Sequence, residues 1–499
     1  MTGKTVVEGD VEVSEGIDYA RFYSTSMKQF AELPDVDIAP KGTILVISPW
    51  NFPCAIPIGG IVAGLAGGNT VILKPATVAA PVAWLFAKAF WDAGVPKEAL
   101  QVIITDREAL KVLTTAPAVK HIILTGGTDT AQNIARSNPA TPLSAETGGK
   151  NAIILTASGD RDHAIMNIVA SAFGNAGQKC SACSLLLVER SVYEDKNFQD
   201  KLKDAATSMK VGSVWNPGNV VGPMITNKND KLLKALELEK GESWLVPPRF
   251  LDKHKYVLAP TVKWGVRPGN YSFRTELFGP MLSVVCIENL QQGINWVNSL
   301  DYGLTSGLQS LDEGEQKLWK DSIMAGNLYI NRGITGAIVN RQPFGGMKLS
   351  AFGGGVKAGG PNYCACFVKI TDKLGSTTEY TQSYVKAYEQ EFAHARDVNN
   401  LYGEQNAFRY LPLKNMVLRL FPGDNNEDAK MIALAARICH TPLSISFEPG
   451  DDRTAALASL GCPLKEEALA GFLKSMKNYE RIRTCGRIFR WKCMRKLHV

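Results

Sequence analysis

The stretch GTILVISPWNFPCAIPIGGIVAGLAGGNTVILKP, residues 42–75, decides the fold of this chain. It begins with a short apolar run rich in β-branched residues, which predicts a strand ending near Ser48. Apolar residues at helical spacing follow, and the second apolar run, TVILKP, predicts another strand. A strand, a helix and a second strand in this order indicate a βαβ unit, whose two strands run parallel.

The same alternation continues along the chain and predicts a parallel sheet with helices on both faces. Beyond this stretch, helices are expected at 81–94, 107–116 and 130–138, and strands at 100–105 and 119–125. Ligands of such sheets bind beyond the carboxyl ends of the strands. Two turn-like motifs lie at those ends, SPWNFP at 48–53 and TGGTDTA at 125–131.

A second α/β region is expected after residue 150, and a third part after a polar boundary at 375–395. The patterns in these parts are a strand at 151–156, a helix at 163–177, a strand at 181–189, a strand at 408–423 and a helix at 428–439. The segment 343–363 is dense in glycine, but apolar and basic residues interrupt it. We therefore expect a shaped loop there and not a flexible linker.

Composition places the chain among globular proteins, because 45% of its 499 residues are hydrophobic and 21% are charged. The formal net charge of +7 is carried by the segment 464–499, so the rest of the chain is balanced. A basic end on a neutral body argues against nucleic acid as a ligand. No apolar run reaches the roughly 18 residues that span a bilayer, so no membrane segment is expected.

Ten cysteines are scattered along the chain, and its first residues lack the basic and apolar regions of a secretory leader. This pattern predicts reduced thiols in a cytoplasmic protein. Cys180 and Cys183 lie three residues apart in GNAGQKCSACS, which raises the choice between a metal site, a redox pair and a single nucleophile. A zinc site needs about four ligands, and no second CxxC stands at finger spacing, so no metal is expected. A thioredoxin-type pair lacks its flanking motifs.

A cysteine that attacks an aldehyde needs an oxyanion donor, a base and a hydride acceptor. Asn51 follows a strand end, and Glu146 precedes two glycines in SAETGGKN. Lys74 ends the strand TVILKP, and Glu276 precedes a turn in RTELFGP. Each residue alone has a plainer explanation, as a turn residue, a solvated carboxylate or a surface lysine. TGGTDTA also lacks the GxGxxG pattern of the common dinucleotide fingerprint.

Seven motifs taken in order are more specific: PWNFP, KPAT, TGGT, ETGGKN, GQKCSA, ELFGP and PFGG. Together they resemble the aldehyde dehydrogenase superfamily, over residues 18–372. RPGNYSFRTELFGP, YINRGITGAIVNRQPFGG and KAGGPNY resemble, more narrowly, the pyrroline-5-carboxylate dehydrogenase module of bifunctional proline utilisation enzymes. That module oxidises glutamate-γ-semialdehyde, the ring-open form of pyrroline-5-carboxylate, to glutamate with NAD.

The resemblance implies an α/β aldehyde dehydrogenase fold and the same reaction in proline catabolism. The implied parts are a NAD-binding domain at 1–147, a catalytic domain at 148–345, an anchor loop and return segment at 346–374, and a partial aldehyde-dehydrogenase-like domain with a basic tail at 375–499. The implied partners are a small-molecule substrate, a second copy of the chain in a homo-oligomer, and a separate proline dehydrogenase.

The resemblance also implies residue roles. Cys180 is the nucleophile and Cys183 a bystander, Asn51 forms the oxyanion hole with the Cys180 backbone N–H, and Glu146 activates the hydrolytic water. The residues implied in cofactor binding are Ser48, Pro49, Trp50, Lys74, Thr77, Gly126, Gly127, Thr128, Gly148, Glu276 and Phe278. The residues implied in substrate binding are Phe173, Ser181, Gly353 and Gly354, the last two in the anchor loop 350–361, where backbone N–H groups can bind a carboxylate.

The chain departs from the family pattern at several places. PWNFP stands near residue 50, after a first helix expected at 19–33, so we expect the earlier part of the cofactor domain and the proline dehydrogenase barrel to be missing. Gly127 and Thr77 stand where many relatives have serine and glutamate. The last domain is expected to be cut short, and its end, RTCGRIFRWKCMRKLHV (483–499), matches nothing known. Two other hypotheses remain: a dehydrogenase for another aldehyde, and a catalytically silent scaffold piece.

Overall fold

The computed structural model describes residues 2–451 and 453–485, and its contacts group the chain into two compact units. The first unit consists of the residues up to Glu32, Ala39–Asn133 and Pro142–Lys369; the second consists of Leu33–Ile38, Ile134–Thr141 and the residues from Ile370 onward. Residues 486–499, which are most of the end segment 483–499, lie outside the described residues.

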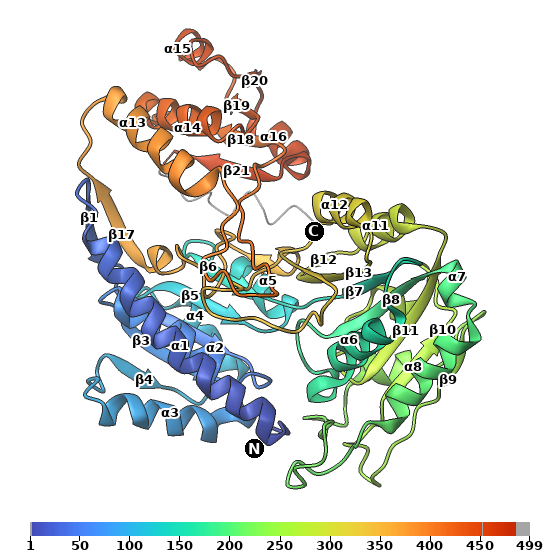
Figure 1. The fold of residues 1–499 in the computed structure, drawn as a ribbon. Coiled ribbons are helices and arrows are strands. Elements are labelled where there is room, and N and C mark those ends of the chain that lie inside the picture. The colour runs from blue at the N-terminus through green and yellow to red at the C-terminus, as the bar shows by residue number, and fades with distance from the viewer. Residues whose placement is uncertain (1, 452, 486–499) are drawn as a thin grey trace. The chain divides into compact units, whose positions relative to one another are not determined.

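The first unit contains a six-stranded sheet in the order β16-β6-β5-β2-β3-β4 (Figure 1). Its strands are β2 (Thr43–Ser48), β3 (Thr70–Pro75), β4 (Leu100–Val102), β5 (Val119–Thr125), β6 (Leu143–Glu146) and β16 (Ala351–Phe352). All pairs are parallel except β16 with β6. The expected parallel sheet is therefore confirmed. Its strand order reverses between β2 and β5, which creates the crevice where such sheets bind ligands.

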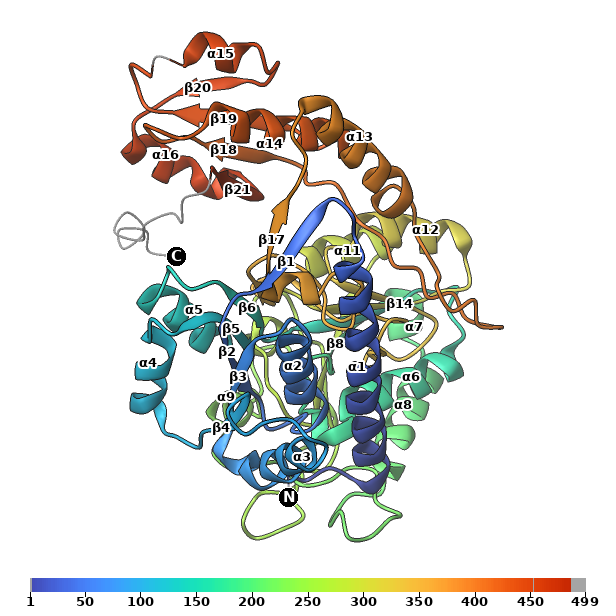
Figure 2. The ribbon, with the colours of Figure 1, turned by 90° about the vertical axis from the view of Figure 1, so that its left-hand side faces the viewer.

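Five helices accompany this sheet: α1 (Val6–Ala31), α2 (Ala55–Ala66), α3 (Ala80–Asp92), α4 (Arg107–Thr115) and α5 (Thr128–Ser137), with a short η1 (Thr77–Ala79). α2 is in contact with β2 and β3, and α1 packs along α2 (Figure 2). α1 begins at Val6 and not at residue 19, because Thr5 and Glu8 form a capping box at its start.

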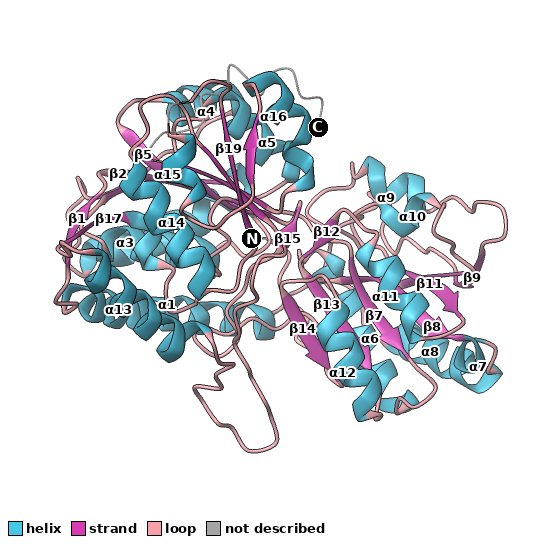
Figure 3. Ribbon diagram, turned by 90° about the horizontal axis from the view of Figure 1, so that it is seen from above, coloured by secondary structure: helices cyan, strands magenta, loops and turns pink. Residues whose placement is uncertain are grey.

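The first unit also contains a seven-stranded sheet in the order β14-β13-β7-β8-β11-β10-β9, in which only the β9 pair is antiparallel (Figure 3). Its strands are β7 (Asn151–Leu155), β8 (Cys183–Glu189), β9 (Ser243–Val246), β10 (Thr261–Trp264), β11 (Met281–Ile287), β13 (Thr305–Gln309) and β14 (Asn327–Ile330).

Helices cover both faces of this second sheet: α6 (Arg161–Phe173) and α8 (Lys196–Ser208) on one, α11 (Leu290–Asn298) and α12 (Glu313–Ser322) on the other. Alternate residues of β8 show this division. Leu186 belongs to the core with α6 and α8, whereas Leu185 and Leu187 belong to the core with α11 and α12. Both faces of the strand are thus apolar, as in a parallel sheet covered on two sides.

Short elements complete the first unit and its borders: η2 (Gly174–Gly177), α7 (Arg190–Tyr193), α9 (Asp230–Ala235), α10 (Tyr271–Arg274), β12 (Tyr302–Gly303), β15 (Met347–Lys348), η3 (Cys364–Phe367), and the paired strands β1 (Val36–Pro40) and β17 (Val368–Asp372). None of the helices within residues 2–451 and 453–485 is long and apolar enough to cross a membrane.

The second unit has its own four-stranded parallel sheet, in the order β20-β19-β18-β21. Its elements are α13 (Thr377–Ala387), η4 (Tyr388–Phe392), β18 (Met416–Arg419), α14 (Asn426–Ile438), β19 (Leu443–Phe447), α15 (Thr454–Ala458), β20 (Leu464–Glu466), α16 (Leu469–Ser475), η5 (Met476–Asn478) and β21 (Arg481–Thr484). The strand and helix expected here are confirmed. The end segment 483–499 begins inside this sheet, since Arg483 and Thr484 belong to β21.

Candidate active site

Polar residues gather where the parallel strands of the six-stranded sheet end. The pairing register sets Ile47 of β2 beside Lys74 of β3 and beside Leu124 of β5, and sets Thr125 beside Glu146 of β6. Ser48, the last residue of β2, therefore lies at the same edge as Lys74 and Glu146. This is the edge at which the sequence predicts ligand binding.

The loop that carries Cys180 is held in place by two asparagines. Asn51, just after β2, donates its amide to the carbonyl of Gln178 at 3.1 Å. Asn151, at the start of β7, donates to the carbonyls of Cys180 at 2.6 Å and Ala182 at 3.1 Å. The structure thus brings Asn51 of the first sheet to the cysteine loop of the second. Asn151 was not singled out from the sequence, although it ends the motif ETGGKN.

The two glycines of ETGGKN allow other groups to approach the backbone closely. A Cβ on Gly149 would lie 2.5 Å from the Cys180 carbonyl oxygen, and a Cβ on Gly148 would lie 2.4 Å from a Glu276 carboxylate oxygen. The same Glu276 carboxylate accepts a hydrogen bond from the Gly149 N–H at 2.7 Å. Any larger residue at either position would push Cys180 or Glu276 away from this turn.

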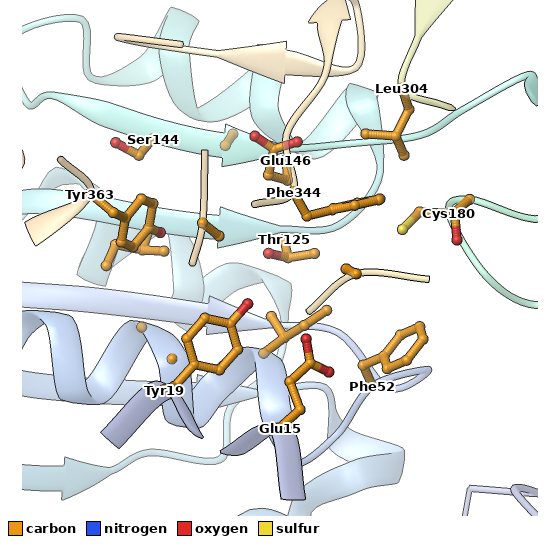
Figure 4. Close-up of a pocket in the computed structure, with 18 of the residues that line it drawn as sticks. Glu15, Tyr19, Phe52, Thr125, Ser144, Glu146, Cys180, Leu304, Phe344 and Tyr363 are labelled. Atoms are coloured by element: carbon orange, nitrogen blue, oxygen red, sulfur yellow. The ribbon is translucent and has the colours of Figure 1, made fainter. Parts of the chain in front are cut away.

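A cavity of about 400 Å³ opens beside the cysteine loop. Cys180, Ser181 and Glu146 line it. Figure 4 shows the Cys180 sulfur and the Glu146 carboxylate on either side of the Phe344 ring, with Glu15 and Tyr19 extending from α1 into the same space. A cavity of this size accommodates a small metabolite.

The electrostatics of the cavity raise the pKa of both central groups. Burial, with smaller contributions from Glu276 and Glu146, raises the pKa of the Cys180 thiol to about 12, and the N–H groups of Ser181 and Cys180 partly oppose the shift. Burial raises the pKa of Glu146 to about 8, against the Gly346 N–H and the charge of Lys357. These shifts favour the neutral thiol of Cys180 at neutral pH and place the titration of the Glu146 carboxyl group near neutrality.

A row of acidic residues on α1 was not predicted from the sequence. Glu8, Glu12 and Glu15 line the cavity together with Lys4 and Lys179. Lys4 pairs with Glu12 at 2.6 Å and Lys179 with Glu8 at 3.4 Å, while burial and the nearby Glu12 raise the pKa of Glu15 to about 7. Their spacing of three to four residues along one helix was the available signal.

Two of the four predicted substrate residues line the cavity. Ser181 and Gly354 contribute to its wall, and Gly353 precedes Gly354 without contributing. The expectation for Phe173 differs from the structure: its side chain is 0% exposed and packs in the core of the seven-stranded sheet. The reason is that the chain turns directly after it, through Asn175 and Ala176 in left-handed conformations. The aromatic rings that line the cavity include Phe52 and Phe344 instead.

Several of the predicted cofactor residues lie at or just after the ends of the strands β2, β3 and β5, and their chemistry fits a dinucleotide. The Ser48 hydroxyl is buried and has no hydrogen-bond partner among the described residues. A Cβ on Gly127 would meet no atom within 4 Å, directly before the first residue of α5, Thr128. An open backbone at a helix N-terminus is a site for phosphate oxygens.

The remaining cofactor residues come from both sheets. Burial lowers the pKa of Lys74 at the end of β3, and Thr77 is exposed at the start of η1. Trp50 and Phe278 meet edge to face, with ring centroids 5.6 Å apart, so the segments that follow Ser48 and Glu276 lie side by side. Pro49, Gly126 and Gly148 lie in the turns that follow β2, β5 and β6, respectively.

Cys183 differs from Cys180 in its surroundings. It is 1% exposed, begins β8 and belongs to the same core as Phe173. Its sulfur lies 3.4 Å from the Leu185 carbonyl, and burial raises its pKa to about 12. These are the surroundings of a structural cysteine.

Comparisons with known proteins agree with the geometry. The sequence profile of the aldehyde dehydrogenase family matches residues 1–372. A protein of Geobacillus sp. (strain WCH70) named 1-pyrroline-5-carboxylate dehydrogenase is 34% identical over 382 residues, which cover 72% of this chain and 73% of that protein. The protein of the same name from Bacillus subtilis (strain 168) is 33% identical over the same shares of both chains.

Solved structures are similar as well. Proline utilization A from Corynebacterium freiburgense is 37% identical with a TM-score of 0.84, covering 94% of this chain but only 52% of that chain. A point mutant of Thermus thermophilus 1-pyrroline-5-carboxylate dehydrogenase is 32% identical with a TM-score of 0.69, covering 74% of this chain and 75% of that one. This chain thus spans about half of the first protein and three quarters of the second.

Proposed function

Because the chain belongs to the aldehyde dehydrogenase family, we propose that it oxidises L-glutamate-γ-semialdehyde, the ring-open form of pyrroline-5-carboxylate, to L-glutamate with NAD. The observation that carries the proposal is the cavity that Cys180 and Glu146 line together, with Asn51 bonded to the cysteine loop. The names of the dehydrogenases from Geobacillus and Bacillus support the choice of substrate.

In the proposed mechanism, the Cys180 sulfur adds to the aldehyde carbon. The new oxyanion lies near the Asn51 amide and the Cys180 backbone N–H, and each such donor contributes roughly 3 kcal/mol. Since the thiol has a raised pKa, it must lose its proton as it adds, and this proton passes to the solvent. NAD, when bound, supplies a positive charge and the acceptor for the hydride that leaves the same carbon.

The second half of the reaction releases glutamate from a thioester on Cys180. A water molecule attacks the thioester carbon, and Glu146 removes the proton of that water. Cys180 leaves as a thiolate and is reprotonated. Glu146 is suited to this part because its raised pKa keeps it a strong enough base near neutral pH, at the wall of the cavity that holds the thioester.

The charges of the cavity match the proposed substrate, which carries an α-carboxylate and an α-ammonium group. We propose that the Ser181 hydroxyl and the backbone at Gly354 bind the carboxylate. Glu15 is the carboxylate at the wall that can accept from the ammonium group, since Glu12 is already paired with Lys4. Lys179 adds positive charge next to the nucleophile.

For the cofactor, we propose that Lys74 and Thr77 lie at the adenosine ribose, and that Gly126, Gly127 and Thr128 hold the pyrophosphate. Glu276 and Phe278 lie at the nicotinamide ribose, near Trp50. The buried Ser48 hydroxyl and the open backbone at Gly127 support this placement. The preference for NAD over NADP is part of the proposal.

The deciding experiment is NADH formation by the purified full chain with L-glutamate-γ-semialdehyde, followed by its absorbance. We expect turnover that exceeds that with propanal, because only the semialdehyde carries the carboxylate and ammonium groups that Ser181, Gly354 and Glu15 are proposed to bind. Faster turnover of propanal would show a dehydrogenase for another aldehyde. No NADH with either aldehyde, from folded protein, would show a catalytically silent scaffold.

Ser181→Ala should raise the KM for L-glutamate-γ-semialdehyde by about tenfold or more, and the KM for propanal far less. The reason is that a hydrogen bond to a charged group contributes roughly 1.5 to 3 kcal/mol. Steady-state kinetics with both aldehydes measure the difference. Ser184→Ala is the matched control, because Ser184 lies three residues further on and does not line the cavity. An equal change in KM for both aldehydes in Ser181→Ala would show that Ser181 does not bind the carboxylate.

Thr77→Glu should increase the preference for NAD over NADP, because it weakens the binding of NADP alone. A glutamate there can bind the ribose hydroxyls of NAD but repels a 2′-phosphate, whereas Thr77 is neutral and leaves a preference of about tenfold to a hundredfold. The kcat/KM ratio for the two cofactors measures the effect. Thr115→Glu places the same charge at an exposed position on α4 and should change nothing. An unchanged ratio in Thr77→Glu would show that Thr77 does not face the ribose.

We further propose that the protein works in the cytoplasm beside a separate proline dehydrogenase. Nine cysteines of the described residues are free thiols, as expected in a reducing compartment. The similarity to about half of a proline utilization A chain supports the partner. The homo-oligomer stays a prediction, which light scattering of the purified protein would test.

A further inference from the structure

Lys357 is a partly buried cation that the proposed chemistry of Cys180 and Glu146 does not use. It lies in the glycine-rich loop between β16 and η3. Burial lowers its pKa to about 8, and the nearby Glu146 opposes the shift. A lysine ammonium group that is withdrawn from solvent needs hydrogen-bond or charge partners, so the partners of Lys357 indicate its role.

The ammonium group of Lys357 belongs to a network that fixes a turn. It donates to the carbonyl of Gly326 and, at 3.1 Å, to the side-chain oxygen of Asn327. The same Asn327 oxygen accepts from the Gly345 N–H at 3.2 Å, and the Asn327 amide donates to the Pro343 carbonyl at 2.9 Å. Lys357 and Asn327 together thus hold the turn 343–346.

This turn donates to the general base. The Gly346 N–H donates to one oxygen of the Glu146 carboxylate at 3.2 Å. A Cβ on Gly345 would lie 3.2 Å from the other Glu146 oxygen and 3.0 Å from Cγ of Lys357. Only the small Gly345 therefore separates the stem of the lysine from the carboxylate.

We propose that Lys357 is a positioning residue for Glu146: it fixes the turn that donates to the carboxylate and places a positive charge beside it. The inference rests on the proposed role of Glu146 as the base. Lys357 itself does not have to touch the substrate, because its charge and its hydrogen bonds act through the carboxylate.

The sign of the effect follows from the groups that face Glu146. Lys357 favours the carboxylate form and lowers the pKa of Glu146. Cys180, Tyr19 and Tyr363 are its other titratable neighbours, and burial raises the pKa of each, so all three are neutral near pH 7. Removing the lysine charge leaves the carboxylate without a cationic partner and should shift its titration to higher pH.

The test is the pH dependence of kcat, measured with L-glutamate-γ-semialdehyde from mildly acidic to alkaline pH on the full chain. The rising limb is the increase of kcat with pH that reports the ionisation of Glu146. In Lys357→Met, this limb should shift to higher pH by about one pH unit or more, and kcat near neutral pH should fall by about tenfold, with a smaller change in KM. Lys357→Arg keeps the charge and should keep the limb near its wild-type position.

Two further variants separate charge from folding. Lys357→Gln keeps a donor for the Gly326 carbonyl without the charge, and should move the limb even if Lys357→Met is too unstable to purify. Lys348→Met is the matched control, because Lys348 follows the turn 343–346 and also anchors this part of the chain, by donating to the carbonyls of Asn298 at 2.8 Å and Leu300 at 2.9 Å. It should leave the limb in place. Thermal unfolding of each variant reports the structural cost.

The outcomes separate this inference from the proposed function. Normal turnover of the wild type with an unmoved limb in Lys357→Met and Lys357→Gln would overturn the inference alone. An equal shift in Lys348→Met would also overturn it, since loosening the loop would then be enough. No NADH from folded wild-type protein would overturn the proposed function and, with it, the role of Lys357.

Discussion

Cys180→Ala should abolish NADH formation, with a loss of at least about a thousandfold in kcat/KM. The variant removes the only atom in the proposed mechanism that can bond to the aldehyde carbon, and losing a nucleophile typically has effects of this size or larger. The fold should survive, because Cys180 lies at the cavity wall and its loop is held through backbone carbonyls by Asn51 and Asn151. The measurement is steady-state NADH formation, with thermal unfolding as the check on folding.

Cys183→Ala is the matched control for this prediction. Cys183 is enclosed in the core at the start of β8, so its loss leaves a small cavity and costs on the order of 1 kcal/mol of stability. We expect a lower melting temperature and most of the activity. Equal losses of activity in both variants would contradict the hypothesis of a single nucleophile and would favour a redox pair of Cys180 and Cys183.

The fold was predictable because the apolar runs are short, continuous and separated by helical spacing. β2, β3 and β5 were found because parallel strands covered on both faces must be apolar throughout. The start of α1 was missed because glycine and acidic residues interrupt its apolar pattern. There the helix start is set by the capping box of Thr5 and Glu8, a local signal that the sequence contains, and by packing on α2, which is tertiary information.

The positions of candidate residues were predictable where a motif places a residue at a strand end, as with Glu146, or next to the cysteine loop, as with Asn51. It was not predictable where folding brings a distant helix over the cavity. Glu15 reaches the wall only because α1 packs along α2. Phe173 was misplaced for a related reason, since the left-handed turn after α6 decides which way its ring points.

Glu146→Gln should lower steady-state turnover by about 10²- to 10⁴-fold, the usual contribution of a general base. The amide is nearly isosteric with the carboxyl group, so the hydrogen bond from the Gly346 N–H can persist. The amide cannot accept the proton of the attacking water. We therefore expect the thioester on Cys180 to accumulate, which intact-protein mass spectrometry detects after mixing with substrate and NAD.

The pH dependence of the wild type gives the same group an independent signature. Since burial raises the pKa of Glu146 to about 8, its active carboxylate form is the minor form at neutral pH and becomes the major form as pH rises through that value. Turnover should thus increase about tenfold from about pH 7 to about pH 9, and Glu146→Gln should lose this rising limb. Glu15→Gln is the control, because Glu15 is another carboxylate at the cavity wall with a raised pKa, of about 7. Its loss should raise the KM for the semialdehyde and leave the limb of Glu146 in place. A limb that persists in Glu146→Gln and disappears in Glu15→Gln would assign the base to α1 and overturn the role of Glu146.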